Sequence, residues 1–248
     1  ENRSASAFAR KGKSKEDISE ISESPPEAPA FVLPVLDGIT GLPAEIVAKR
    51  DVDALVQLLV ASSDLALHMQ IMFALRNYAT SDENTRARIG KADGIQTIVF
   101  AMQIHRGPEP CNALLQELAM WTLWNLAMCP VNSVRMSGSS ALAATLDAMV
   151  THVSVAGVQE QGCWLLVYLV WNDLHCRQRA RLCSAQDVVY SAMCAHPHHQ
   201  GVQQYAQQCL HHLEDGPNDR EPLNLAETVP TQALSQSIFL NSLRLLRK

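Results

Sequence analysis

The chain has 248 residues, of which 47% are hydrophobic and only 5% aromatic, and its formal net charge is −5. This length allows a substantial hydrophobic core without support from disulfides or metals. The negative charge excludes a chain-wide attraction to phosphate backbones, so nucleic-acid binding is not expected. Ala, Leu, Met and Gln, which favour helices, are prominent, and the composition therefore predicts an all-helical protein.

The first predicted region is a tail and linker over residues 1–33. Residues 1–15 carry five Lys or Arg against one Glu, whereas residues 16–30 are acidic and rich in Pro. Neither stretch has the apolar side chains needed for a core. The basic, Ser- and Ala-containing start, with Glu1 in place of Met, has two interpretations: a disordered tail or the remnant of an organelle-targeting segment.

One sequence pattern then occurs four times within residues 34–213. Its copies are LHMQIMFALRNYA from Leu67, LQELAMWTLWNLA from Leu115, VQEQGCWLLVYLV from Val158 and VQQYAQQCLHHL from Val202. Gln, Glu and Trp coincide in the second and third copies. The insertion RGPEPCNA, interpreted as a loop, explains the wider spacing between the first two copies. A period of about 44 residues indicates a repeat protein.

Two shorter patterns precede each copy. GIQTIVFAMQIH, LAATLDAMVTH and QDVVYSAMCAH, with a degenerate DVDALVQLLVASS at 51–63, predict amphipathic helices that end at His105, His152 and His196. We expect these histidine rings to complement the exposed carbonyls of the last turn. A still shorter element places Arg directly before an aliphatic residue, at Arg88-Ile89, Arg135-Met136 and Arg181-Leu182.

Residues 41–213 resemble armadillo-repeat proteins, because QELAMWTLWNLA and QEQGCWLL are similar to the consensus of the third helix of that family. The resemblance implies a short, a second and a longer third helix in each repeat, stacked into a right-handed superhelix. We therefore predict an all-α fold: a right-handed α-solenoid of about four three-helix repeats, followed by a C-terminal helix. A helical period in the 40s independently indicates a solenoid.

The resemblance also implies a binding site. In this family the third helix lines a concave groove, where Trp and Asn four residues apart bind extended peptides through the indole ring and the amide. The matching positions, predicted to contact a partner, are Phe73, Asn77, Trp121, Asn125, Trp164 and Tyr168. The fourth copy has Gln208 and His212 there, and the departures at Tyr168 and Gln208 argue against a long array of backbone clamps. The alternative is that Trp121 and Trp164 only pack between repeats.

Catalytic and cofactor chemistry is not indicated. The sequence has no GxSxG, P-loop or GxGxxG motif, and its Cys and His residues occupy equivalent repeat positions instead of converging. We expect no catalytic residue, no cofactor and no metal. The seven cysteines lack metal-ligand spacing and indicate a reducing compartment, either the cytoplasm or the interior of a mitochondrion or plastid. Metal binding through the His196-His199 cluster stays open as an alternative function.

The C-terminal region comprises a linker over residues 214–230 and a predicted amphipathic docking helix over 231–248. Its apolar residues include Leu234, Ile238, Phe239, Leu243 and Leu246. Such a helix can fold back onto the last repeat, lie in a partner's groove or contact an anionic membrane surface. No apolar run reaches the ~20 residues of a transmembrane helix.

These features predict a non-catalytic protein–protein interaction scaffold. We expect a structural or accessory subunit of a larger multiprotein assembly, with an organellar membrane complex among the candidates. The rival function is a cargo or peptide adaptor of the nuclear-import type. That function needs acidic side chains beside the Trp and Asn positions, and the sequence offers Glu117 and Glu160.

Overall fold

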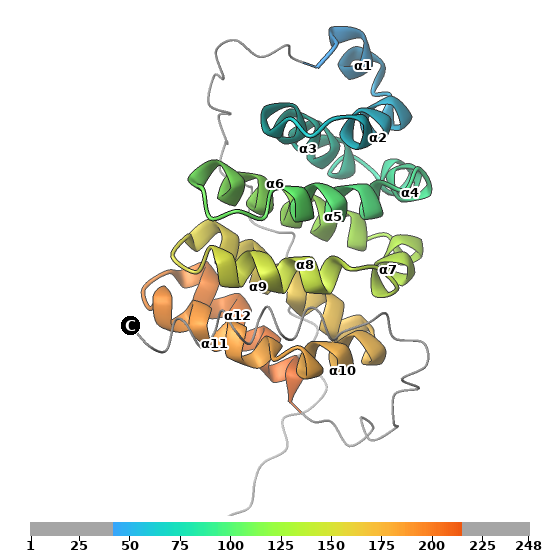
Figure 1. Cartoon of the computed structure of the whole chain (residues 1–248). Coiled ribbons are helices and arrows are strands. Elements are labelled where there is room, and N and C mark those ends of the chain that lie inside the picture. The colour runs from blue at the N-terminus through green and yellow to red at the C-terminus, as the bar shows by residue number, and fades with distance from the viewer. Residues whose placement is uncertain (1–41, 215–248) are drawn as a thin grey trace, which may run out of the picture. The chain divides into compact units, whose positions relative to one another are not determined.

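A computed structural model describes residues 42–214, and this part of the chain is all-helical, with no strand. The predicted tail, the C-terminal linker beyond Glu214 and the docking helix lie outside the described residues. The helices, shown in Figure 1, are α1 (Ala44–Lys49), α2 (Val52–Ala61), α3 (Leu65–Ala79), α4 (Glu83–Lys91), α5 (Gly94–Ile104), α6 (Pro110–Ala127), α7 (Pro130–Ser137), α8 (Ala141–Thr151), α9 (Ala156–Asn172), α10 (Leu174–Leu182), α11 (Ala185–Ala195) and α12 (Gln200–Leu213).

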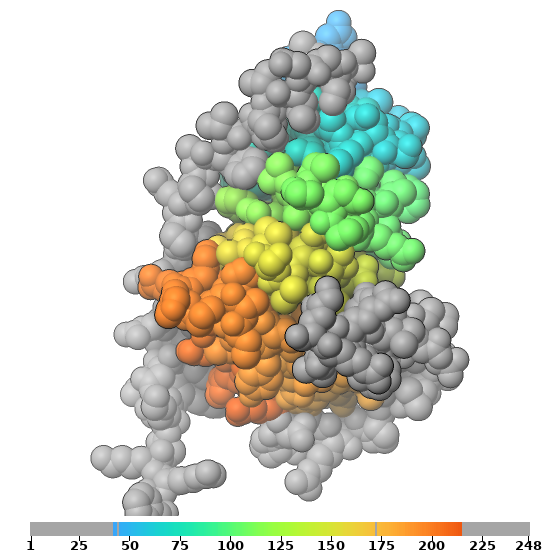
Figure 2. Space-filling model, turned by 60° about the vertical axis from the view of Figure 1, so that its left-hand side comes forward, coloured from blue at the N-terminus to red at the C-terminus, as the bar shows by residue number. Residues whose placement is uncertain are grey.

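The helix lengths repeat along the described chain. A short helix is followed by a helix of intermediate length, which we call the middle helix, and then by a long one. The lengths are 6, 10 and 15 residues in α1–α3, then 9, 11 and 18, then 8, 11 and 17, and finally 9, 11 and 14 in α10–α12. We call each set of three a layer and number the layers 1 to 4. Figure 2 shows them as successive bands from cyan to orange.

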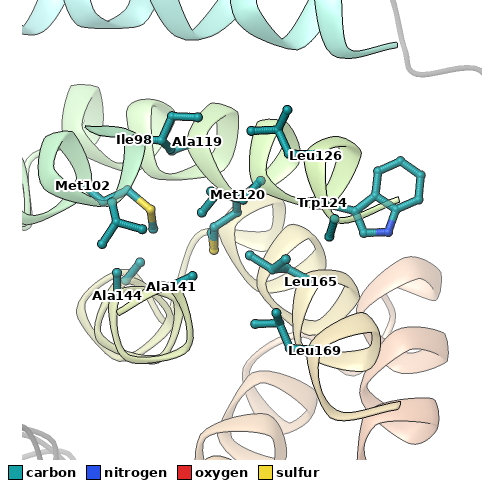
Figure 3. Close-up of a cluster of buried hydrophobic side chains, with 14 of the residues drawn as sticks. Ile98, Met102, Ala119, Met120, Trp124, Leu126, Ala141, Ala144, Leu165 and Leu169 are labelled. Carbon is teal, nitrogen blue, oxygen red and sulfur yellow. The ribbon is translucent and has the colours of Figure 1, made fainter. Parts of the chain in front are cut away.

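Helices of the same kind pack on each other from layer to layer. The long helices α3, α6, α9 and α12 form one column, and the middle helices α2, α5, α8 and α11 form a second. The core lies between these two columns and includes Met102 of α5, Met120 of α6 and Leu165 of α9 (Figure 3). Because each layer is covered by the next, apolar surface is buried between neighbours along the whole stack.

A repeated hydrogen-bond pattern joins the middle and long helix of each layer. In layer 2, the Gln116 Nε2 donates to the carbonyls of Met102 and His105, at 2.9 and 2.8 Å. These carbonyls end α5 and would otherwise lack a partner. Equivalent glutamine joints, as we name them, occur in the next two layers, from Gln159 to Met149 and His152 and from Gln203 to Met193 and His196.

Layer 1 uses a histidine where the others use glutamine. The His68 ring nitrogen Nε2 lies 2.9 Å from the carbonyl oxygen of Ser62, the residue that ends α2. His68 stands at the same place in α3 as Gln116 in α6. The joint is therefore present in all four layers, with one ring substituting for an amide.

The three histidines of the repeated AMxxH pattern do end the middle helices, but not for the reason expected. His105, His152 and His196 are the C-caps of α5, α8 and α11. Two of the rings bond elsewhere, at 3.1 Å from His105 Nε2 to His68 Nδ1 and 2.8 Å from His196 Nε2 to the Val153 carbonyl, while the buried Nε2 of His152 has no hydrogen-bond partner. Burial lowers the pKa of His105 and His152, which opposes a cationic cap. The glutamine amides satisfy the carbonyls instead.

Two details of the repeat differ from what the sequence pattern suggests. The insertion RGPEPCNA is only partly a loop, because α6 begins at Pro110, whose fixed φ suits the first position of a helix. In the short helices, Ile89 and Met136 are buried, but Leu182 is 60% exposed. The buried position of α10 belongs to Ala180, so the equivalent pair there is Arg179-Ala180.

Candidate functional site

The predicted partner-binding residues all lie on the column of long helices. Phe73 and Asn77 are one turn apart on α3, with Phe73 half-buried and Asn77 exposed. Between them in sequence is Arg76, which the repeat pattern did not single out. Its guanidinium carbon lies 3.9 Å from the centre of the Trp121 ring and 5.3 Å from that of Phe73. This cation–π contact connects layers 1 and 2 on the predicted face.

Arg76 is a buried cation with unused donors. The residue is 9% exposed, and its Nε and Nη1 atoms have no hydrogen-bond partner. Burial lowers the pKa of Arg76, while the negative charge of Glu117 acts in the opposite direction. Among residues 42–214, no carboxylate forms an ion pair with Arg76.

Trp121 and Asn125, one turn apart on α6, are brought to the same column, but Asn125 is not open to a partner. Asn125 is 3% exposed, and its Nδ2 donates to the Trp121 carbonyl at 2.9 Å. The amide therefore bonds its own helix. Trp121 is half-buried and remains the better contact.

Three aromatic rings from three layers stack on one another. The Trp164 ring of α9 lies 4.0 Å from the Trp124 ring of α6, at 33° between the ring planes. On its other side it lies 5.1 Å from the Tyr205 ring of α12, at 5°. Figure 3 shows Trp124 extending from α6 on the side away from Met102. Trp164 is therefore packed between layers and still only half-buried. Packing between repeats and contact with a partner do not exclude each other at this residue.

A second aromatic group lies further along the same two helices. Tyr168, half-buried on α9, meets the Trp171 ring edge-on at 6.5 Å, and Trp171 lies 6.4 Å from the His212 ring of α12. Trp171 is 46% exposed. The predicted positions Trp164 and Tyr168 therefore belong to a continuous set of rings that reaches the end of the column.

Two carboxylates on this column contact glycines of the following layer. A Cβ atom built on Gly157 would lie 2.2 Å from a Glu117 oxygen, and one on Gly201 would lie 1.9 Å from a Glu160 oxygen. Both glycines are in the first turn of a long helix, where the helix dipole favours a negative charge. Burial raises the pKa of Glu117, with a smaller contribution in the same direction from Glu160.

The histidine cluster has bonds of its own. His196 contacts the Val153 carbonyl, and His199 Nδ1 accepts a hydrogen bond from the Val202 amide at 3.3 Å, which caps α12. In the described part of the chain, no group of three His, Cys, Asp or Glu side chains is placed to hold a metal ion.

The cysteines differ in exposure. Cys111 and Cys194 are exposed, and the other five are buried. Burial raises the pKa of Cys163 and Cys176 to about 12, so these thiols stay protonated and are poor nucleophiles at neutral pH.

Among residues 42–214, no helix is long and apolar enough to cross a membrane.

Sequence reasoning missed Arg76, Trp124 and Tyr205. Trp124 follows Trp121 by three residues, so helical spacing alone could have placed both on neighbouring faces. The position of α12 that aligns with Trp164 is Gln208. The residue that contacts the Trp164 ring is instead Tyr205, three residues earlier in the same helix. Nothing in the sequence could have revealed that Arg76 would meet Trp121.

No protein-family model and no curated protein matches the chain. Among solved structures, the fold is similar to the crystal structure of an engineered protein from the Northeast Structural Genomics Consortium. The TM-score is 0.56 at 18% sequence identity, over 69% of this chain and 67% of that one. At this identity the likeness concerns the fold alone.

Proposed function

We propose that residues 42–214 form about four armadillo-type repeats of a right-handed α-solenoid, whose long-helix column binds extended segments of partner proteins. The ordered helix lengths, the two columns and the glutamine joints support this interpretation. In such an array each repeat is stabilised by its neighbours, so the surface along one column is continuous and rigid.

The observation that carries the proposal is the composition of the long-helix column. Aromatic side chains from all four layers line it, including Phe73, Trp121, Trp164 and Tyr205, and they are held by ring and cation contacts. Rings fixed before binding lose little conformational entropy when a partner arrives. Aromatic residues and Arg are also the side chains that dominate binding energy at protein interfaces.

The function that follows is a non-catalytic scaffold, a structural or accessory subunit of a larger assembly. Affinity purification of the tagged full chain, followed by mass spectrometry, tests it. We expect a small, stoichiometric set of proteins that is lost in the Phe73→Ala variant. The matched control is Phe100→Ala on α5, a 47% exposed phenylalanine of the other column. Equal capture by both variants would contradict the assignment of the face.

A cargo adaptor is the second candidate, because Glu117 and Glu160 give the column two carboxylates. Two features count against it: the cation of Arg76 lies on the same column, and the amide of Asn125 bonds its own helix. Recovery of many proteins with basic signals, instead of one defined complex, would favour the adaptor.

A further inference from the structure

The positive charges of the described residues are concentrated on the short helices. Within residues 42–214, seven of the eleven Lys and Arg residues lie in α4, α7 and α10, although these helices contain only one of the fourteen Asp and Glu residues. The rest of the described chain therefore has a negative formal charge, and the three short helices have a positive one. Their basic residues are Arg86, Arg88, Lys91, Arg135, Arg177, Arg179 and Arg181.

Three of these arginines occupy equivalent positions in successive layers. Arg88 of α4, Arg135 of α7 and Arg179 of α10 each directly precede a buried apolar residue of the same helix. All three lie in the last turn of their helices. We call these three residues the arginine ladder.

Hydrogen bonds between the short helices hold the arginine ladder together. Asn132 Nδ2 of α7 donates to the Arg86 carbonyl of α4 at 2.7 Å, and Arg135 Nη1 donates to Asn132 Oδ1 at 3.3 Å. From the next layer, Arg179 Nη1 donates to the Ser137 carbonyl of α7 at 2.8 Å. Figure 1 shows α4, α7 and α10 at the same side of the stack. The ladder therefore follows one continuous edge of the stack.

The positive charge of the ladder is not balanced within the described residues. No ion pair of Arg88, Arg135 or Arg179 occurs among residues 42–214. The oxygens that accept from Arg135 and Arg179 belong to a neutral amide and a carbonyl, which satisfy a donor without cancelling its charge. Asp82 and Asp173 cap the opposite ends of α4 and α10. The helix dipole favours a cation in the last turn, but it leaves this edge positive.

Apolar side chains are exposed beside the middle of the ladder. Val131 and Val134 of α7 are 55% and 76% exposed, and Val134 directly precedes Arg135. Single exposed apolar residues are common, but these two lie one turn apart on the helix that carries the arginine. A partner that covers them removes apolar surface from water, which a phosphate backbone cannot do. This edge therefore suits a protein segment better than a nucleic acid.

We propose that the arginine ladder, together with Val131 and Val134, binds an acidic and partly apolar segment of a partner protein. Carboxylates of the segment pair with the guanidinium groups, whose planar fork suits them, and its aliphatic side chains cover the two valines. This surface lies on the short helices. The inference therefore goes beyond the proposed function and does not depend on the long-helix column.

Fluorescence anisotropy with the full chain and a labelled peptide, Glu-Leu-Asp-Glu-Leu-Asp-Glu-Leu-Asp-Glu, tests the charge requirement. Arg88→Glu should weaken binding at least about fivefold, because it brings like charges together at the ladder. Arg88 is exposed, so this change leaves the core intact. The matched control is Arg106→Glu, the same charge reversal at an exposed arginine outside the short helices, which should weaken binding less than about twofold. Equal losses in the two variants would overturn the proposal.

A second pair of variants tests the apolar contact. Val134→Ser should weaken binding of the same peptide about threefold, because part of the apolar contact is lost. It should not change binding of the peptide in which every Leu is replaced by Ser. The control is Val60→Ser on α2, at a valine that is 59% exposed. If Val134→Ser and Val60→Ser behave alike, the valines of α7 are not part of the surface and the proposal fails.

Two other anionic probes identify rival partners of the ladder. They are a labelled oligothymidylate and vesicles of phosphatidylcholine and phosphatidylserine. We expect the acidic peptide to bind more tightly than the oligothymidylate, and the vesicles not to displace it. Tighter binding of either rival that is lost in Arg88→Glu would assign this edge to nucleic acid or to a membrane, and would overturn the proposal. Far-UV circular dichroism verifies that each variant keeps its helices.

Discussion

The glutamine joints and the charged residues of the long-helix column, Arg76, Glu117 and Glu160, lie in the same stack of layers, but their polar groups differ in hydrogen bonding. At the joints, Gln116, Gln159 and Gln203 each give one amide group to two carbonyls at the end of a middle helix. On the long-helix column, by contrast, the Nε and Nη1 atoms of Arg76 have no hydrogen-bond partner, and no ion pair of Arg76 or Glu117 is found within the described residues. Repetition by itself does not separate a structural residue from a binding one.

The difference indicates where function lies. Buried polar groups in folded proteins are nearly always hydrogen-bonded, because leaving one unpaired costs free energy. A joint contributes to stability because it satisfies helix ends, although the Oε1 atoms of Gln116 and Gln159 have no hydrogen-bond partner. A half-buried carboxylate without an ion pair contributes little to stability, and a partner that pairs it can gain affinity. Mutations in the two regions should therefore separate stability from binding.

The largest effect on stability is expected at the joints. Gln159→Leu keeps the size of the side chain but leaves the Met149 and His152 carbonyls without their donor. We expect the free energy of unfolding to fall by about 2–4 kcal/mol, from two unpaired buried acceptors. Urea denaturation followed by circular dichroism measures it. Gln207→Leu, at an exposed position of α12, should change it by less than ~0.5 kcal/mol, and a similar loss in both would contradict the comparison.

A smaller loss is expected where the two regions meet, at the ring that covers Arg76. Trp121→Leu removes the cation–π contact and should lower the free energy of unfolding by about 0.5–2 kcal/mol. The control is Trp171→Leu, because Trp171 is 46% exposed and its ring lies beside the rings of Tyr168 and His212. The same denaturation experiment compares them. If Trp171→Leu is the more damaging change, Trp121 does not hold Arg76 in place.

A pH effect sharpens the comparison at the layer 1 joint. Burial lowers the pKa of His68 and of His105, whose rings are hydrogen-bonded to each other. Above the unfolded-state pKa of about 6.5, both rings are neutral in either state and their contribution is constant. Below it the unfolded chain takes up protons that the fold resists, so stability decreases as the pH falls.

His68→Gln installs the residue that the other joints use and removes one titrating ring. Between pH 7 and pH 5 this variant should lose less stability than the natural chain in urea denaturation. Glu117 and Asp147, whose pKa values are raised by burial, act with the opposite sign, but they are common to both proteins and cancel in the difference. Identical pH profiles would show that the histidine pair does not set the slope.

The smallest effect on stability is expected at the two carboxylates of the long-helix column. Glu117→Gln with Glu160→Gln keeps the size of both side chains and removes two charges that form no ion pair within the described residues, so the free energy of unfolding should stay within ~0.5 kcal/mol. Partner capture should nevertheless be lost. Glu83→Gln with Asp187→Asn is the charge-matched control and should retain capture. A strongly destabilised double variant would mean that the contacts with Gly157 and Gly201 hold the layers together.

Much of the candidate site could be predicted from the sequence because it repeats. Phe73, Trp121, Trp164 and Tyr168 were found by aligning copies of one helix, and all four lie on the long-helix column. What alignment could not provide is the direction of each side chain. Asn125 aligns with Asn77, but one amide bonds its own helix while the other residue is exposed.

The sequence by itself determined the helices and their order in this protein. Apolar residues three and four apart define amphipathic helices from local chemistry alone, and a period near 44 residues sets three of them per layer. Only the tertiary structure decided which polar groups find partners. The glutamine that serves a neighbouring helix end, the histidine ring that bonds the layer before and the arginine beneath Trp121 all depend on contacts between residues distant in the chain, which no local pattern specifies.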